Sequence, residues 1–312
     1  MANVFITIPD FSLHGGIRVI LEWANRLTVW HSVHLHNLKG ETHCNWFNIN
    51  PDVKLVGANM KGMDILIITS PHSIHFQDRP DLPERTFIFM QMCEHMFKPN
   101  DKDWQRKCYT FYTSKHHLIS ISKWNINVIT NQFGRKGVTH YVGNGVNLDH
   151  FPISNKPKDE GTVLIEGWES GNSSKDPDHI GPKVAARLKA DGYSICAYSA
   201  KPLVTMSDVP DEYYCKPSLA QLNELYERAT ILIKATKYDA RSCAPMEAMT
   251  KGTVTVRGII EGDDDLIDEK TFHDEFNCDP MAAYKFISDN FNDSPINFSE
   301  DDRIVKVELL GS

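Results

Sequence analysis

The chain has 312 residues and a net charge of −8 at pH 7, with 41% hydrophobic and 24% charged residues, values ordinary for a globular protein. It contains no run of about 18 apolar residues, which excludes a transmembrane helix. Its seven cysteines are odd in number and include no C-x-x-C pair. This pattern excludes a zinc site and a disulfide framework and favours reduced thiols, so we expect a cytoplasmic protein.

Charge is divided unevenly along the chain. Residues 1–155 hold 15 Lys and Arg against 12 Asp and Glu, a net charge of +3, and the remainder holds 18 against 29, a net charge of −11. Twelve of the 14 histidines also lie in the first half. Because a chain of about 300 residues is long for one hydrophobic core, we expect two domains with different partners.

The first half alternates strands with helices. Short β-branched runs bounded by turn residues predict strands at 4–8, 64–69, 86–90 and 118–122. A strand this close to the first residue argues against a signal peptide. A helix is predicted from Gly16, because apolar residues recur there at the spacing of one buried face: Ile17, Ile20, Leu21, Ala24 and Leu27. Strand, glycine turn, helix and strand form the unit of a doubly wound parallel sheet.

The second half repeats this order after a break. Residues 153–161 are polar and predict a linker. Beyond it, strands are predicted at 162–166, 195–198, 231–235 and 253–257, and helices at 219–229 and 245–250. We therefore expect an α/β fold of two Rossmann-like domains, 1–152 and 162–312, with parallel sheets facing a central ligand-binding cleft. The last helix would pack back on the first domain.

The strongest local signal lies in residues 234–249, where a strand ends, a loop follows, and Pro245 stands in the first turn of a helix that Gly252 ends. The N–H groups of a helix N-terminus suit a diphosphate. Asp239 in the loop and Glu247 in the helix would accept hydrogen bonds from sugar and ribose hydroxyls. The alternative is a capping Asp and an exposed Glu.

This segment resembles the signature of family-4 GT-B glycosyltransferases, in which an acidic residue, seven residues and Glu-Ala-Met are followed by Gly-Thr and a strand. Here Asp239 precedes Glu247-Ala248-Met249 by seven residues, and Gly252-Thr253 follows. The resemblance implies that Asp239 contacts the donor sugar and Glu247 the ribose, while the amides of Ser242, Cys243 and Ala244 hold the diphosphate. Asp239 is shorter than the family's usual Glu, which reduces its reach.

Other segments resemble the same family in order and spacing. Gly15-Gly16 resembles a glycine pair whose backbone approaches the diphosphate. Residues 91–97 resemble a Q-x-x-E motif, which implies that Glu94 and His95, with His14, contact the sugar or the acceptor. Further matches are the segments 120–123, 144–151 and 222–233. The resemblance implies retaining transfer from a nucleoside-diphosphate sugar, with no metal and no further cofactor.

The family's arginine and lysine after the first strand of the second domain are only half present. Lys175 fills the lysine position, whereas Trp168 or Glu169 stands where the arginine is usual. We expect Arg241, inside the signature loop, to supply the missing positive charge on the leaving phosphate.

Two other patterns suggest metal sites. Asp263-Asp264-Asp265 superficially resembles the metal motif of the other glycosyltransferase fold, but it lies in an acidic stretch typical of a solvated loop. His34 and His36 share one face of a predicted strand without a third ligand at suitable spacing, so packing or surface histidines are favoured.

In this family the first half binds the acceptor. Residues 98–136 interleave basic and aromatic side chains: Lys98, Lys102, Arg106, Lys107, Lys115, Lys123, Arg135 and Lys136 with Trp104, Tyr109, Phe111, Tyr112 and Trp124. This composition predicts a polyanionic acceptor, either DNA with a modified base such as a hydroxymethylated pyrimidine, or a lipid or polysaccharide at an anionic surface. The alternative is that the aromatics are core and the charges scattered.

Two other functions stay open at this stage. The chain is short for the family, so it could bind a nucleotide sugar or a glycan without transferring it. It could also be a GT-B sugar-nucleotide epimerase, which converts the donor without an acceptor.

Overall fold

The computed structural model describes residues 1–154, 156–167, 180–200, 202, 210–234, 240, 242–257 and 304–305. The chain divides into two compact units, Met1–Gly143 and a second that begins at Asn144. Each unit is built on its own parallel sheet. The helix expected at the end of the chain lies outside the described residues, as does the acidic stretch around Asp264. Within the described part, no helix has both the length and the apolar character needed to cross a bilayer.

The first unit holds a seven-stranded sheet in the order β3-β2-β1-β4-β5-β6-β7, and every neighbouring pair is parallel. The strands are β1 (Asn3–Ile8), β2 (Ser32–Asn37), β3 (Lys54–Leu55), β4 (Ile65–Ile68), β5 (Arg85–Met90), β6 (His117–Ser120) and β7 (Thr139–Tyr141). The four strands predicted for this half are confirmed with small differences at their ends. Short apolar runs buried on both faces are typical of parallel sheets.

Helices cover both faces of this sheet. They are α1 (Gly15–Leu27), α2 (Lys102–Thr113) and α3 (Lys123–Phe133), with the 3₁₀ helices η1 (Pro71–Asp78) and η2 (Glu94–Phe97). Helix α1 packs beside β1 and β2, and four of the five residues of its predicted apolar face are fully buried. Trp23 of this helix packs against Phe89 of β5, with ring centroids 4.4 Å apart.

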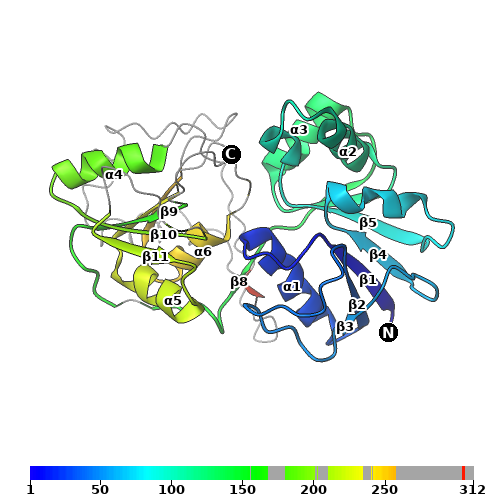
Figure 1. Cartoon of the computed structure of the whole chain (residues 1–312), viewed down its shortest axis with the longest axis horizontal. Helices are drawn as coiled ribbons and strands as arrows, with labels where there is room; N and C mark the ends of the chain where they lie inside the picture. Colours follow the sequence, from blue (N-terminus) through cyan, green and yellow to red (C-terminus); the bar gives the residue numbers. More distant parts are fainter. Residues whose placement is uncertain are drawn as a thin grey trace. The chain divides into compact units, whose positions relative to one another are not determined.

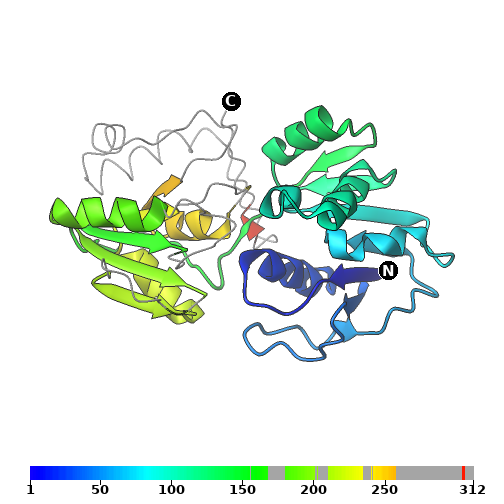
Figure 2. The same ribbon diagram turned by 45° about the horizontal axis from the view of Figure 1, so that its top comes forward.

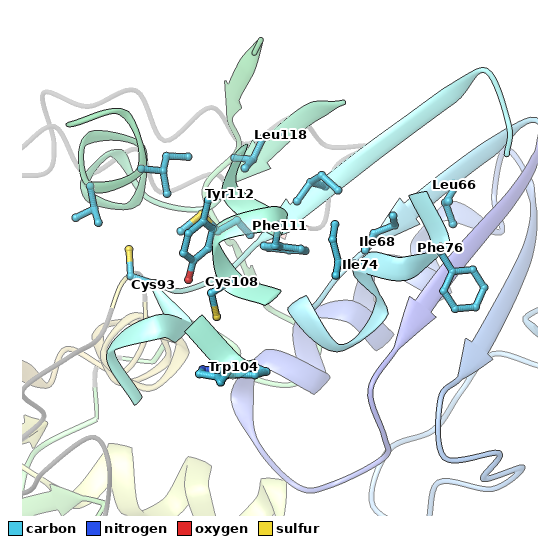
Figure 3. Close-up of a cluster of buried hydrophobic side chains, with 14 of the residues drawn as sticks. Leu66, Ile68, Ile74, Phe76, Cys93, Trp104, Cys108, Phe111, Tyr112 and Leu118 are labelled. Carbon is cyan, nitrogen blue, oxygen red and sulfur yellow. The ribbon is translucent and has the colours of Figure 1, made fainter. Parts of the chain in front are cut away.

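The opposite face is packed by η1, α2 and α3. Figure 3 shows the cluster of buried hydrophobic side chains on this face, which includes Trp104, Phe111 and Tyr112 of α2 and Leu118 of β6. Asp101 begins α2, because its side chain accepts a hydrogen bond from the Trp104 N–H at 3.0 Å. The large aromatic residues of α2 therefore form part of the core.

The second unit contains a five-stranded parallel sheet in the order β11-β10-β9-β12-β13. Its strands are β9 (Thr162–Glu166), β10 (Ser194–Ser199), β11 (Glu212–Cys215), β12 (Ile231–Lys234) and β13 (Val254–Arg257). Its helices are α4 (Ile180–Ala190), α5 (Leu219–Arg228) and α6 (Cys243–Met249), and β8 (Val146–Asn147) pairs antiparallel with β14 (Ile304–Val305). Helix α4 covers one face of the sheet, while α5 and α6 cover the other (Figures 1 and 2).

The segment expected to be a linker, 153–161, is bonded to the second unit. The Ser154 N–H donates to the Thr250 carbonyl at 2.9 Å. The ammonium of Lys158 donates to the Tyr226 carbonyl at 2.8 Å and to the Thr253 hydroxyl at 2.9 Å. This segment thus bonds to the Tyr226 carbonyl of α5, to the Thr250 carbonyl at the end of α6 and to the Thr253 hydroxyl just before β13.

The buried ammonium of Lys158 predicts a pH dependence of stability. Burial lowers the pKa of Lys158 to about 8 from 10.5. Between these two pH values the unfolded chain binds more protons than the folded chain, so stability rises with pH. We expect the unfolding midpoint of the wild type to rise relative to that of Lys158→Met from about pH 8 to about pH 10.5. Denaturant unfolding of both proteins tests this, and a constant difference across the range would contradict it.

Candidate functional site

Both sheets place a topological switch point at their centre. In the first sheet the chain runs outward from β1 to β3 and returns to β4 on the other side of β1. In the second it runs outward from β9 to β11 and returns to β12 beside β9. In open α/β sheets of this kind, ligands bind at the carboxyl ends of the strands at this point. The described site residues predicted from the sequence lie at this edge of their own sheets, except Glu247, which lies further along its helix.

The glycine pair lies where α1 follows β1. His14 begins the helix, and its Nδ1 accepts a hydrogen bond from the Ile17 N–H at 3.4 Å. The side-chain amide of Gln91, at the end of β5, donates to the Gly16 carbonyl at 3.0 Å. Gln91 thus joins the end of β5 to the first turn of α1, a role that the Q-x-x-E resemblance did not assign to it.

The loop before the glycine pair is fixed by side chains of the segment after β2. The Phe11 N–H donates to the Glu41 carboxylate at 2.8 Å, and the Trp46 indole donates to the Phe11 carbonyl at 2.7 Å. Asp10 pairs with Lys39 at 2.7 Å. Burial opposes ionisation of Asp10, but the bonds from Lys39 and Ser12 outweigh it and lower its pKa to about 2. The loop is therefore held by charged partners at neutral pH.

The fold does not require glycine at either position of the pair. Neither residue has a positive φ. Among the residues that the structure describes, a Cβ on Gly15 would meet nothing within 4 Å, and one on Gly16 would make ordinary contacts with Gln91 and His14 at 3.5 to 3.6 Å. The backbone at Gly15 thus borders open space, which a ligand needs in order to approach it.

Glu94 and His95 lie in η2, just after β5, at the same edge of the first sheet. The His95 N–H donates to the Tyr112 hydroxyl at 3.2 Å, and the His95 Nδ1 lies 3.4 Å from that oxygen. Burial lowers the pKa of His95, so the ring is neutral at pH 7. The Trp104 indole fixes η2 by donating to the Glu94 carbonyl at 2.9 Å.

In the second unit, Glu247 is only 4% exposed. The Tyr226 hydroxyl of α5 donates to Glu247 Oε2 at 3.3 Å, and the Tyr198 hydroxyl of β10 lies 2.9 Å from the Tyr226 hydroxyl. The alternative of an exposed glutamate is therefore wrong. The two tyrosines were missed by sequence reasoning, and each looked like an ordinary core aromatic.

The three residues predicted to hold the diphosphate begin α6. Ser242 is the N-cap and has extended backbone angles, but its side chain makes no capping hydrogen bond. Cys243 and Ala244 form the start of the helix, and Pro245 lies in the first turn as predicted. Because α6 follows β12 in a parallel sheet, this turn lies at the carboxyl edge. Asp239, Lys175 and Arg241 lie outside the described residues, so their roles stay predictions.

Sequence reasoning also missed a buried ion pair at this edge. Lys234, the last residue of β12, has its ammonium 2.6 Å from Oε2 of Glu166, the last residue of β9. The sequence feature that could have indicated this pair is a single charged residue at the end of each of two apolar strands.

The basic and aromatic segment divides between core and surface. Trp104, Phe111 and Tyr112 are buried, and Trp124 packs against the same cluster. Tyr109 is 55% exposed. Arg135 is buried, whereas the other seven basic residues of the segment are exposed. The prediction of a surface that interleaves these residues is thus wrong for most of the aromatics and for Arg135, because composition does not reveal which face of a helix a residue occupies.

The histidine pair of β2 is engaged with neighbouring residues. His36 stacks on Phe5, and its Nδ1 lies 3.1 Å from the Val56 carbonyl. His34 Nε2 lies 3.2 Å from the Ser32 hydroxyl. Within the described ranges, no three His, Cys, Asp or Glu side chains come together as metal ligands, and the cysteines are free thiols.

Solved structures share this architecture. No protein-family model matches the chain, and no curated protein sequence matches it. Sucrose-phosphate synthase from Thermosynechococcus elongatus has a TM-score of 0.69 at 12% identity, covering 91% of this chain and 92% of that chain. Anabaena HepE, solved with UDP-glucose, has a TM-score of 0.62 at 9% identity, covering 93% and 95%. A glycosyltransferase from Rickettsia africae has a TM-score of 0.61 at 11% identity, covering 93% and 94%. The chain has the GT-B fold of these proteins.

Proposed function

We propose that the protein is a retaining glycosyltransferase that moves a sugar from a nucleoside diphosphate to an acceptor hydroxyl. The observation that carries this proposal is the placement of Glu247, a buried carboxylate on the helix that follows β12, the strand beside the central strand β9 of a doubly wound sheet. A glutamate at this point of the signature, on a GT-B fold, supports donor binding. Because HepE was solved with UDP and with UDP-glucose, uridine nucleotides are the donors to test first.

The second unit supplies the donor side of the proposed reaction. Glu247 accepts hydrogen bonds from the ribose hydroxyls and Asp239 from those of the sugar. The amides of Ser242, Cys243 and Ala244, with Lys175 and Arg241, stabilise the charge that develops on the leaving phosphate. In this proposal these groups replace a metal ion. The leaving phosphate takes the proton of the acceptor, so the mechanism needs no strong base from the protein.

The first unit supplies the glycine pair and the acceptor side. The open space beside Gly15 supports the approach of a diphosphate to the backbone. Burial lowers the pKa of His95, and a neutral imidazole offers one hydrogen-bond donor and one acceptor to a hydroxyl group. Glu94 is the neighbouring hydrogen-bond acceptor. His14 is the third candidate contact.

Gly15→Ala tests the role of the glycine pair. A methyl group at this helix position meets no atom of the described residues within 4 Å, so the melting temperature should stay the same or rise slightly. If a diphosphate approaches this backbone, the methyl group should raise the KM for the donor about tenfold. Gly57→Ala is the matched control, because a Cβ there also meets nothing within 4 Å. An unchanged KM in Gly15→Ala would remove the pair from the donor site.

The exposed basic residues of the first unit support a polyanionic acceptor. Several basic residues of segment 98–136 are exposed, among them Lys98, Lys102, Lys107 and Lys123. Three phosphate contacts would make binding about tenfold or more weaker as salt rises from about 50 to about 200 mM. Duplex DNA with hydroxymethylated cytosine and vesicles with anionic lipid are the two probes. If the binding of both probes does not change with salt concentration, a polyanionic acceptor is excluded.

Measurement of nucleotide release tests the proposed reaction. Wild type and Glu247→Ala are incubated with nucleotide sugars, with and without each acceptor, and free nucleoside diphosphate is quantified. Transfer predicts nucleotide release that rises with acceptor and is lost in Glu247→Ala. An epimerase would convert the donor without release, and a binding protein would do neither.

A further inference from the structure

A buried lysine and glutamate lie directly at the switch point of the second sheet. Glu166 and Lys234 are the final residues of β9 and β12 and face each other in the register of the sheet. These two strands flank the reversal of strand order, where doubly wound sheets bind their ligands. The pair therefore occupies the part of the sheet where a ligand is expected.

Both side chains project toward the face covered by α5 and α6. Strand residues alternate between faces, and Leu164 and Leu232, two positions before the pair, lie in the cluster of that face. Val163 and Ile233 lie in the cluster of the α4 face. The face shared by Lys234 and Glu166 is thus the one on which Glu247 is buried.

The pair is costly as a purely structural feature. The side chain of Lys234 is 8% exposed and that of Glu166 is 21% exposed. Their charged atoms lie 2.6 Å apart, so the Lys234 ammonium is the partner of Glu166 Oε2. Buried ion pairs seldom stabilise a fold more than apolar residues of similar size would. An ion pair kept at the carboxyl ends of the two strands beside the switch point points to a polar ligand that shares its charges.

The chemistry of the pair fits a sugar diphosphate. A lysine ammonium carries three donors, so it can keep its contact with a carboxylate and also bind a phosphate oxygen. Its charge acts more strongly in a partly buried site than in water. Glu166 holds this charge in place and offers an acceptor to a ligand hydroxyl.

We infer that Lys234 binds the diphosphate of the donor and that Glu166 positions its ammonium. This inference rests on the proposed function, and it assigns to Lys234 a positive charge in addition to those expected from Lys175 and Arg241. It predicts that the affinity for nucleoside diphosphates depends on Lys234, whereas the affinity for the corresponding nucleosides does not.

The test replaces both charges together, because Lys234→Leu alone would leave Glu166 buried without its partner and could prevent folding. The double variant Lys234→Leu/Glu166→Leu keeps the site apolar, and Lys234→Met/Glu166→Gln keeps the shapes of both side chains. Lys251→Met is the matched control, since Lys251 is also buried but lies between α6 and the start of β13, at the opposite edge of the sheet. Far-UV circular dichroism and melting temperature establish that each variant folds.

Calorimetric titration then measures affinity for UDP, GDP, ADP and CDP and for the four nucleosides. We expect the double variants to lose about tenfold or more in affinity for the diphosphate that the wild type prefers. Their affinity for the nucleosides should not change. The Lys251→Met variant should bind the diphosphate as tightly as the wild type does. Wild-type affinity for that diphosphate in a folded double variant would overturn the inference while leaving the proposed function intact. A wild type that binds none of these diphosphates would overturn both.

Discussion

Replacing Glu247 with glutamine is expected to lower donor affinity by about tenfold to about a hundredfold while leaving the fold intact. The amide keeps the shape of the side chain and an oxygen that accepts the Tyr226 hydrogen bond. What is lost is the charge, and hydrogen bonds to a charged group contribute about 1.5–3 kcal/mol. Titration of UDP-glucose and related nucleotide sugars into both proteins measures the effect.

Two variants separate this role from packing. Glu224→Gln changes an exposed glutamate of α5 and should leave donor affinity unchanged. Tyr226→Phe keeps the buried ring and removes the hydroxyl that orients the Glu247 carboxylate, so it should weaken donor binding by a smaller factor. Donor affinity in Glu247→Gln equal to that of the wild type would show that the carboxylate does not touch the ribose.

Arg135→Ala is expected to destabilise the first unit by about 3 kcal/mol or more. The buried guanidinium donates to the carbonyls of Tyr112 and Ser114 at 2.7 and 2.9 Å, and to those of His116 and Val138 at 2.6 and 3.2 Å. It therefore ties the end of α2 to the chain around β6 and β7. Removing it leaves several buried carbonyls without a donor, each with a substantial desolvation cost.

Thermal and denaturant unfolding measure this loss. Lys136→Ala is the control, because Lys136 is exposed and adjacent in sequence, so its removal should change stability by less than about 0.5 kcal/mol. A stable Arg135→Ala variant with weakened binding of anionic acceptor would instead return Arg135 to the acceptor surface predicted from composition.

The central strands could be predicted because they are buried on both faces. Residues 162–166 contain the apolar run Val163-Leu164-Ile165 and form β9 with the predicted bounds. The edge strands could not be predicted in this way. Strand β7 is a half-exposed Thr-His-Tyr, and β11 is a Glu-Tyr-Tyr-Cys segment without a fully buried residue. Such strands lack the apolar signal, because their place is set by pairing with a neighbour.

The candidate site was only partly visible in the sequence. The spacing from Asp239 to Glu247 identified the helix that carries Glu247, since a signature of this kind fixes residue types at set positions. The Lys234–Glu166 pair was not visible, because a charge at the end of an apolar strand usually marks a turn into solvent. Only the register of two parallel strands brings these residues together, although 68 positions separate them in the chain.

A thermal-shift screen of the wild type across nucleotide sugars tests the central claim, that the second unit binds a nucleoside-diphosphate sugar, most directly. A ligand that binds only the folded state raises the melting temperature, by an amount that grows with its concentration relative to Kd. We predict that at least one nucleotide sugar, with uridine donors examined first, raises the melting temperature, and that the rise is reduced in Glu247→Gln. A melting temperature unchanged by every nucleotide sugar, at concentrations far above typical donor KM values, would contradict the assignment.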